Sequence, residues 1–413
     1  MLEAAARPIG DAVTPLKAAD RALVPPFEVM SILDRVAHMR AAGRDVISLC
    51  AGEPSAGAPR AVSARAAEIH ASGLALTYTG ALGIRPLREA VAAHYGRWYG
   101  LDVDPDEVAI TTGSSGAFVL AFLAAFNHGD RVALARPGYP AYRNILRALG
   151  CQVVELDCGP AERYQPTPAL LEAAAAAHGG LDGLILASPA NPTGTMATRA
   201  ELGALTGWCA ENGVRLVSDE IYHGITYPAD PHAPGARGVC AWELDRTAVV
   251  ISSFSKYWGM TGWRLGWALM PADLAGAIDA LAGNVALCPP APAQLAAVEA
   301  FTEESYAGAD AAVAGYAQVR ALLLENLGRL DWGSAAPADG AFYLYADLGP
   351  QLAGFADSAA YCRALLEQEG VALVPGADFD GVHGTRSVRL SFAAGREAVA
   401  GALGRILRFQ SRR

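Results

Sequence analysis

Short apolar runs alternate with helix-length stretches through the middle of the chain, and this alternation restricts the folds open to it. Segments such as 117–126 and 143–150 have helical length. The runs that predict strands are 108–111, 131–135, 183–188, 214–219 and 248–255. Strands alternating with helices form a mostly parallel sheet covered on both faces. We therefore expect an α/β fold that binds ligands beyond the carboxyl ends of its strands.

The pattern changes towards the C-terminus. Helical stretches dominate after about residue 295, and a late pair of strands is predicted at 341–348 and 387–392. This change indicates a second, smaller α+β domain. The Pro/Gly-rich segment 227–238 predicts a surface excursion, because proline removes donors that a sheet needs.

Composition excludes several classes of protein. The chain has 413 residues, 52% hydrophobic and 18% charged, as in globular proteins. A net charge of −10 disfavours nucleic-acid binding. The longest apolar run, 117–126, is about half of a membrane-spanning helix, and the N-terminus lacks the apolar region of a signal peptide. Seven cysteines without a C-x-x-C pair suggest neither a zinc site nor disulfides. We expect a soluble cytoplasmic protein without a metal.

Lysine is scarce in this chain. Only Lys17 and Lys256 occur among 32 basic residues, so arginine serves almost everywhere else. An arginine cannot lose its proton in a protein, whereas a lysine amine can do so and attack a carbonyl. Lys256 follows a predicted strand in a Ser/Gly-rich turn, which suggests a lysine that forms a Schiff base. A solvated surface lysine is the alternative.

Polar residues follow each predicted strand. Gly113, Ser114 and Ser115 begin an apolar helix, where free N–H groups can bind a phosphate, although the serines could simply cap the helix. Tyr139 could cover a planar cofactor or only pack. Asn191 could bind a ligand or its own backbone.

The strand at 214–219 ends on a carboxylate. Asp219 would be buried there, which is costly unless it meets a cation, although Ser218 or Asp219 could instead cap a helix. Tyr222 follows three residues later. The turn after the next strand then supplies Ser253, Ser255 and Arg264 beside the lysine.

These residues fit one cofactor, pyridoxal phosphate. Lys256 would form the Schiff base with its aldehyde, and Asp219 would keep the pyridine nitrogen protonated. Tyr139 would lie on the ring. The ring oxygen would take hydrogen bonds from Asn191 and Tyr222. The phosphate would be bound at the start of the helix and by the serines and arginine of the lysine turn, namely Ser114, Ser115, Ser253, Ser255 and Arg264.

The chain resembles the class I/II aminotransferases of the type I pyridoxal-phosphate fold. The motifs that carry the resemblance are SPANPTGT, SDEIYHG, SFSKYWGMTGWRLGW and SVRLSF, and the match extends over roughly residues 25–410. The resemblance implies three further residues. Arg389 would bind the substrate α-carboxylate, for which a planar guanidinium is suited. Gly52 would line the substrate site. Tyr78 would reach the phosphate of the neighbouring subunit's cofactor.

The resemblance also implies a homodimer and a small domain formed by both chain ends. The expected divisions are an N-terminal arm (1–24), the first part of the small domain (25–59), a large cofactor-binding domain (60–305) and the remainder of the small domain (306–413). The implied reaction moves an amino group between an amino acid and a 2-oxo acid, with Lys256, assisted by Asp219 and Tyr222, transferring the proton.

Substrate preference is suggested by one position. Some relatives that prefer aspartate have a lysine where this chain has Ser115, and that lysine binds the distal carboxylate. Its absence here favours neutral amino acids as substrates. An arginine from the partner subunit could still make the enzyme prefer aspartate.

Other functions are alternatives. The same cofactor could support β-elimination. Ser253 and Lys256 also match the S-x-x-K motif of serine acyl-enzymes, but the K-T-G motif is missing. A non-catalytic regulator would be expected to lack Lys256 or Asp219.

Overall fold

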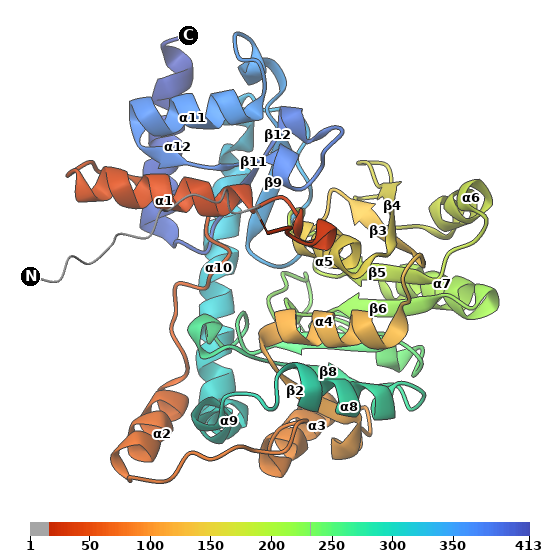
Figure 1. Cartoon of the computed structure of the whole chain (residues 1–413). Coiled ribbons are helices and arrows are strands. Elements are labelled where there is room, and N and C mark those ends of the chain that lie inside the picture. Colours follow the sequence, from red (N-terminus) through yellow and green to blue (C-terminus); the bar gives the residue numbers. More distant parts are fainter. Residues whose placement is uncertain (1–15, 232) are drawn as a thin grey trace, which may run out of the picture.

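A seven-stranded sheet forms the centre of the protein. The computed structural model describes residues 16–231 and 233–413 (Figure 1). The strands are β2 (Val108–Thr112), β3 (Arg131–Arg136), β4 (Gln152–Asp157), β5 (Gly183–Ala187), β6 (Arg215–Asp219), β7 (Val249–Ser253) and β8 (Leu265–Leu269). Their order is β2-β8-β7-β6-β5-β3-β4. From β7 to β4 all neighbours are parallel, whereas β8 is antiparallel to both β2 and β7.

Both faces of this sheet are buried. In β3, Val132 and Leu134 pack into one hydrophobic cluster, while Ala133 between them packs into the other. Leu184 and Ile185 of β5 divide in the same way. Successive side chains of a strand point to opposite faces, so a strand that is apolar throughout needs cover on both sides.

Helices supply that cover. On one face lie α4 (Gly113–Ala125), α5 (Pro140–Leu149) and α8 (Ala275–Val285), and on the other lie α3 (Arg85–Tyr99), α6 (Pro168–His178) and α7 (Arg199–Asn212). Threonine side chains cap the N-termini of two of these helices, α6 and α7. Thr167 accepts a hydrogen bond from Leu170 N, and Thr198 forms a capping box with Glu201.

A smaller part is built from both ends of the described chain. Its strands form two sheets, β11-β12-β9 and β1-β10. The elements are α1 (Glu28–Ala41), β1 (Ile47–Ser48), β9 (Tyr343–Asp347), α11 (Ser358–Glu369), β10 (Val371–Ala372), β11 (Val374–Pro375), β12 (Ser387–Ser391) and α12 (Arg396–Ser411). The long α10 (Glu303–Leu330) runs from the lower helices α2 (Arg60–Ala71) and α9 (Ala291–Ala297) up to this part (Figure 1).

The predicted α/β fold is confirmed, and its central sheet contains two strands that the sequence interpretation did not include. Polar residues alternate in β4, which lies at the edge of the sheet, so it lacks the continuous apolar run of its neighbours. The strand β8 directly follows the lysine turn, and its residues 265–267 end the SFSKYWGMTGWRLGW motif. Apart from residue 232, which lies outside the described residues, segment 227–238 consists of turns, bends and irregular backbone, as predicted.

The domain limits stay predictions. The first fifteen residues of the expected N-terminal arm lie outside the described residues. In the described part of the chain, no helix is both long and apolar enough to cross a membrane.

Candidate active site

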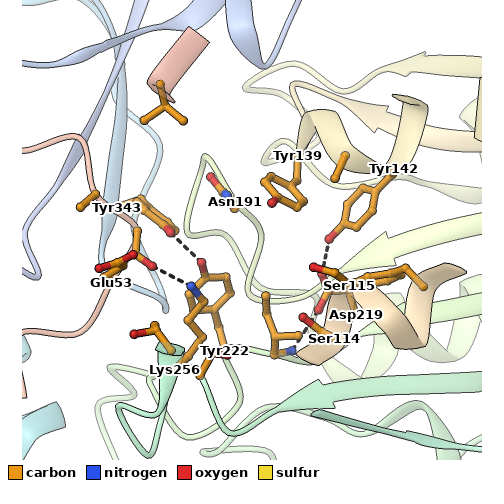
Figure 2. A pocket seen from close by; sticks show the side chains of 18 of the residues that line it. Glu53, Ser114, Ser115, Tyr139, Tyr142, Asn191, Asp219, Tyr222, Lys256 and Tyr343 are labelled. Atoms are coloured by element: carbon orange, nitrogen blue, oxygen red, sulfur yellow. Dashed lines mark hydrogen bonds between the residues drawn. The ribbon is translucent and has the colours of Figure 1, made fainter. Parts of the chain in front are cut away.

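A cavity of about 620 Å³ lies between the ends of the sheet strands and the smaller part of the molecule. Figure 2 shows the side chains that face it. Most residues predicted for the site line this cavity, although they come from distant parts of the sequence. They are Gly52, Ser114, Ser115, Tyr139, Asn191, Asp219, Tyr222, Ser255, Lys256, Arg264 and Arg389.

Lys256 lies in the turn after β7. Its Nζ donates a hydrogen bond to the carbonyl oxygen of Gly52 at 2.6 Å. Burial lowers the pKa of Lys256 to about 8, against the attraction of Glu53. A larger fraction of this amine is therefore neutral near physiological pH than in an exposed lysine, as a nucleophile requires.

Asp219 ends β6 and is buried at the other side of the cavity (Figure 2). Its carboxylate accepts hydrogen bonds from the Tyr142 hydroxyl and from Ile221 N. Burial raises the pKa of Asp219 to about 6 despite these bonds. Because it forms no ion pair within the described part of the chain, Asp219 fits a ligand that brings a cationic group, such as a protonated pyridine nitrogen.

The start of α4 forms an anion site with the lysine turn. Gly113 has a φ of +67°, and a Cβ built there would collide with the guanidinium of Arg264. Ser114 and Ser115 follow in the first turn and line the cavity. Free N–H groups at a helix start, a guanidinium and the Ser255 hydroxyl make a donor set suited to a phosphate.

Arg389 comes from β12 and is 4% exposed. Its Nη1 donates to Asn191 Oδ1 at 3.1 Å and its Nη2 to the carbonyl oxygen of Cys50 at 2.5 Å. Its Nε has no hydrogen-bond partner among the described residues, and Arg389 forms no ion pair with them. A buried guanidinium left in this state fits an anionic ligand such as a carboxylate.

Three predicted residues do not line the cavity. Gly113 contributes through the space it leaves for Arg264. The Ser253 hydroxyl donates to Leu265 O and accepts from Ser255 N, so it supports the turn, and its phosphate contact stays a prediction. Tyr78 is 80% exposed and lies away from this chain's own cavity.

Among the lining residues that the sequence interpretation did not include, three carry a carboxyl or phenol group beside a predicted site residue. Glu53 follows Gly52 and faces Lys256 (Figure 2). Tyr142 lies in the first turn of α5, and its ring contacts that of Tyr139, the residue before the helix, so its place three residues after Tyr139 could have indicated it. The hydroxyl of Tyr343 lies 2.6 Å from that of Tyr222, and nothing in the sequence signals this contact.

The residues that line the cavity fit both ends of a pyridoxal phosphate molecule, the ring nitrogen and the phosphate. The cavity holds a lysine amine with a lowered pKa, a buried carboxylate that forms no ion pair with the described residues, and a set of donors suited to a phosphate. An α/β sheet with such a site defines a class of enzymes that bind this cofactor covalently through lysine.

Comparisons with known proteins place the chain within that class. Residues 44–406 match the family model of the class I and II aminotransferases. A valine–pyruvate aminotransferase of Mycobacterium tuberculosis is 51% identical, covering 94% of this chain and 96% of its own. An aspartate aminotransferase of Geobacillus stearothermophilus is 32% identical, and the match covers 94% of this chain and 97% of that enzyme. The crystal structure of an aminotransferase from Mycobacterium tuberculosis superposes with a TM-score of 0.91 at 50% identity, covering 97% and 100%.

The chain belongs to the class I/II aminotransferases. It is a pyridoxal-phosphate-dependent enzyme that transfers an amino group between an amino acid and a 2-oxo acid.

Proposed function

We propose that this aminotransferase prefers neutral amino acids with small aliphatic side chains, such as valine and alanine, and uses a small 2-oxo acid such as pyruvate. The observation that carries this proposal is an apolar wall on the cavity. Val29, Met30 and Leu33 of α1 line it. An aliphatic substrate side chain that packs against these residues is removed from water. This burial favours binding by about 25 cal/mol per Å² of apolar surface.

The charges in the cavity support the same preference. Among the described residues that line it, the cations are Lys256, Arg264 and Arg389. The first is assigned to the cofactor aldehyde, the second to the phosphate and the third to the substrate α-carboxylate. A second carboxylate on the substrate would have no cation left, and an unpaired buried charge costs several kcal/mol.

One relative supports the proposal by its name. The Mycobacterium tuberculosis enzyme is named for valine and pyruvate, and it is 51% identical. The aspartate aminotransferase is more distant, at 32%. The alternative is an aspartate-preferring enzyme in which a second copy of this chain supplies the missing cation.

We assign the proton transfer to Lys256. Pyridoxal phosphate, when bound, supplies a ring that withdraws electrons from the substrate α-carbon. Lys256, once the substrate has displaced it, would accept the proton from that carbon and deliver it to the cofactor carbon to which Lys256 had been bound. A pKa of about 8 suits a group that must both take and give a proton near neutral pH.

The remaining side chains hold the reactants. Asp219 would pair with the pyridine nitrogen, and Asn191 and Tyr222 would hydrogen-bond the ring oxygen. Tyr139 would cover the ring. The phosphate would be bound by Ser114, Ser115, Ser255 and Arg264, and the substrate carboxylate by Arg389 beside Gly52.

We further propose that the enzyme works as a homodimer in the cytoplasm. The exposed Tyr78 would reach the cofactor phosphate of the partner subunit. Free cysteine thiols, which this chain retains at all seven positions, are typical of that reducing compartment.

Half-reaction rates test the substrate preference. Purified enzyme is mixed with valine, alanine, phenylalanine, aspartate or glutamate at equal concentration, and the absorbance change of the bound cofactor is followed. We expect valine or alanine to react fastest. If aspartate exceeds every neutral amino acid tenfold or more, about 1.4 kcal/mol of discrimination, the proposal is wrong.

A pair of variants tests the apolar wall. Leu33→Ala should lower the half-reaction rate with valine more than the rate with alanine, so that the ratio of the two rates falls about tenfold. The reason is that the valine methyl groups lose a packing partner. Ile32→Ala is the matched control, since Ile32 is on α1 but lines a separate groove beside α11. An equal change in both variants would show that α1 acts only through stability.

A further inference from the structure

We propose that Tyr343 is a positioning residue that connects the two ends of the reaction site. Its hydroxyl orients the hydroxyl of Tyr222 on the cofactor side, and its ring supports Arg389 on the substrate side. The proposal rests on the cofactor contact proposed for Tyr222. It does not depend on which amino acid is the substrate.

The hydroxyl contact joins the two parts of the molecule. Tyr343 begins β9 in the smaller part, and Tyr222 follows β6 of the large sheet. Their hydroxyl oxygens lie 2.6 Å apart and both residues are buried, at 1% and 3% exposed. The rings meet edge to face at 81°, and Figure 2 shows the pair beside Lys256. A short hydrogen bond in a buried site holds its donors in one arrangement.

The direction of this hydrogen bond follows from a count of protons. Each phenol has one proton to donate. When the Tyr222 proton is donated to the cofactor ring oxygen, Tyr222 can only accept from Tyr343. A phenol that accepts one hydrogen bond donates a stronger one, because hydrogen bonds in a chain polarise each other. Tyr343 therefore strengthens the donation by Tyr222.

The ring of Tyr343 faces the guanidinium of Arg389. The guanidinium carbon lies 4.7 Å from the Tyr343 ring centroid and 4.8 Å from that of Phe379. Two aromatic rings therefore hold the guanidinium, and its two terminal nitrogens are fixed by Asn191 and Cys50. Contacts between a cation and a ring face are attractive, and more strongly so when water is excluded.

Gly52 fixes the position of the Tyr343 hydroxyl. A Cβ at position 52 would collide with that hydroxyl, so the two groups are in close contact. The carbonyl oxygen of Gly52 accepts the hydrogen bond from Lys256. Tyr343 thus touches Tyr222, Arg389 and the segment that holds the lysine, which makes it the common neighbour of three groups assigned to the reaction.

A spectroscopic pH titration of the resting holoenzyme tests the hydroxyl role. Tyr222 donation stabilises negative charge on the ring oxygen, so it favours the deprotonated form of the linkage to Lys256. We expect Tyr343→Phe to raise the midpoint of this titration by about 0.5 pH unit or more, about 0.7 kcal/mol. Tyr345→Phe is the matched control, because Tyr345 is buried two residues further along β9 and does not line the cavity.

A third variant separates this inference from the function on which it rests. If Tyr222→Phe leaves the midpoint unchanged, the proposed contact between Tyr222 and the cofactor is wrong. If Tyr222→Phe raises the midpoint but Tyr343→Phe does not, or if Tyr345→Phe raises it equally, the role of the Tyr343 hydroxyl is refuted.

Binding of isovalerate, a carboxylate without an amino group, tests the role of the ring. Tyr343→Phe keeps the ring and should bind isovalerate as the wild type does. Tyr343→Leu removes it and should bind about fivefold more weakly, as expected for a lost cation–ring contact of about 1 kcal/mol. Unchanged binding by Tyr343→Leu, or equal weakening by Tyr345→Leu, would overturn this part. If Tyr343→Leu does not fold, the hydroxyl titration still decides the proposal.

Discussion

Two adjacent carboxyl groups at the end of β6 are both buried, but only Asp219 faces the cavity. Glu220 points to the other side of the strand, where its Oε1 accepts from Ser218 Oγ at 3.0 Å and from Ala241 N at 2.8 Å. Burial raises the pKa of Glu220 to about 8 and that of Asp219 to about 6. At neutral pH, Asp219 is therefore the group that carries the negative charge.

This charge should cost stability in the absence of cofactor. The pKa of Asp219 is raised above its unfolded value of 3.8, so folding favours the protonated form. The cost is fully present above about pH 6 and disappears as the pH falls towards 4. Relative to Asp219→Asn, the cofactor-free wild type should lose up to about 3 kcal/mol of unfolding free energy between pH 4 and pH 6. Urea denaturation at fixed protein concentration measures this difference.

A second aspartate provides a control of opposite sign. Burial acts to raise the pKa of Asp310, but hydrogen bonds from Arg237 and Tyr257 outweigh it and lower the pKa. The stability that Asp310 adds relative to Asp310→Asn should therefore stay nearly constant between pH 4 and pH 6, and should be lost only as the pH falls below about 4. If the Asp310 difference falls between pH 4 and pH 6 as the Asp219 difference does, the environment assigned to Asp219 is wrong.

At the residue scale, the sequence identified groups whose chemistry is unusual and missed those that act through a neighbour. Lys256 stood out because lysine is scarce. Asp219 stood out because it ends a buried strand. Tyr142 and Tyr343 are ordinary core tyrosines in the sequence, and their partners, Asp219 and Tyr222, are brought to them by tertiary packing.

At the scale of elements, the close approach of α4 to the lysine turn forms the site that we propose for the phosphate. Gly113 permits it through a left-handed backbone and an absent side chain. Gly113→Ala should displace Arg264 and strain the backbone by about 1–2 kcal/mol, and so weaken cofactor binding by about tenfold. The dissociation constant of pyridoxal phosphate from the refilled enzyme, followed by fluorescence, measures the effect.

Gly116 is the matched control on the same helix. A Cβ there would make only ordinary contacts with Thr111 and Thr112, at 3.7 and 3.8 Å. Gly116→Ala should leave cofactor affinity unchanged and improve helix stability by up to about 1 kcal/mol. Equal weakening in the two variants would mean that helix geometry, rather than the space for Arg264, determines affinity.

The elements that the sequence revealed share one property. The strands β3, β5, β6 and β7 are buried on both faces, so each has apolar residues at consecutive positions. The edge strand β4 is partly exposed, and its polar residues interrupt the apolar run that would have predicted a strand. Antiparallel pairing of β8 could not be predicted, because it depends on how the chain turns after Arg264 rather than on a local pattern.

At the scale of the whole molecule, we expect two copies to share their sites. Tyr78 is 80% exposed and lies in a segment with exposed Leu74 and Leu76, as a contact surface would require. Mixing Tyr78→Phe chains with Lys256→Ala chains should yield hybrid dimers in which one site lacks both changes. Activity of the mixture should therefore exceed that of both separate proteins.

Ultracentrifugation of each variant verifies that it forms dimers before mixing. A mixture of Tyr345→Phe and Lys256→Ala chains serves as the comparison, because Tyr345 is buried within its own subunit. The activity of this mixture should be the average of the activities of the two separate proteins. A fully active monomer on dilution would show that each subunit has a complete site.

Arg389 and Tyr343 lie on strands made late in synthesis, whereas Lys256 emerges from the ribosome much earlier. The pocket around the lysine is therefore open on its substrate side until β12 has been added to the smaller sheet. A nascent chain can present the amine but cannot yet enclose a ligand. Loading with cofactor should thus follow the addition of β12, and retention of bound cofactor would report that the smaller sheet has formed.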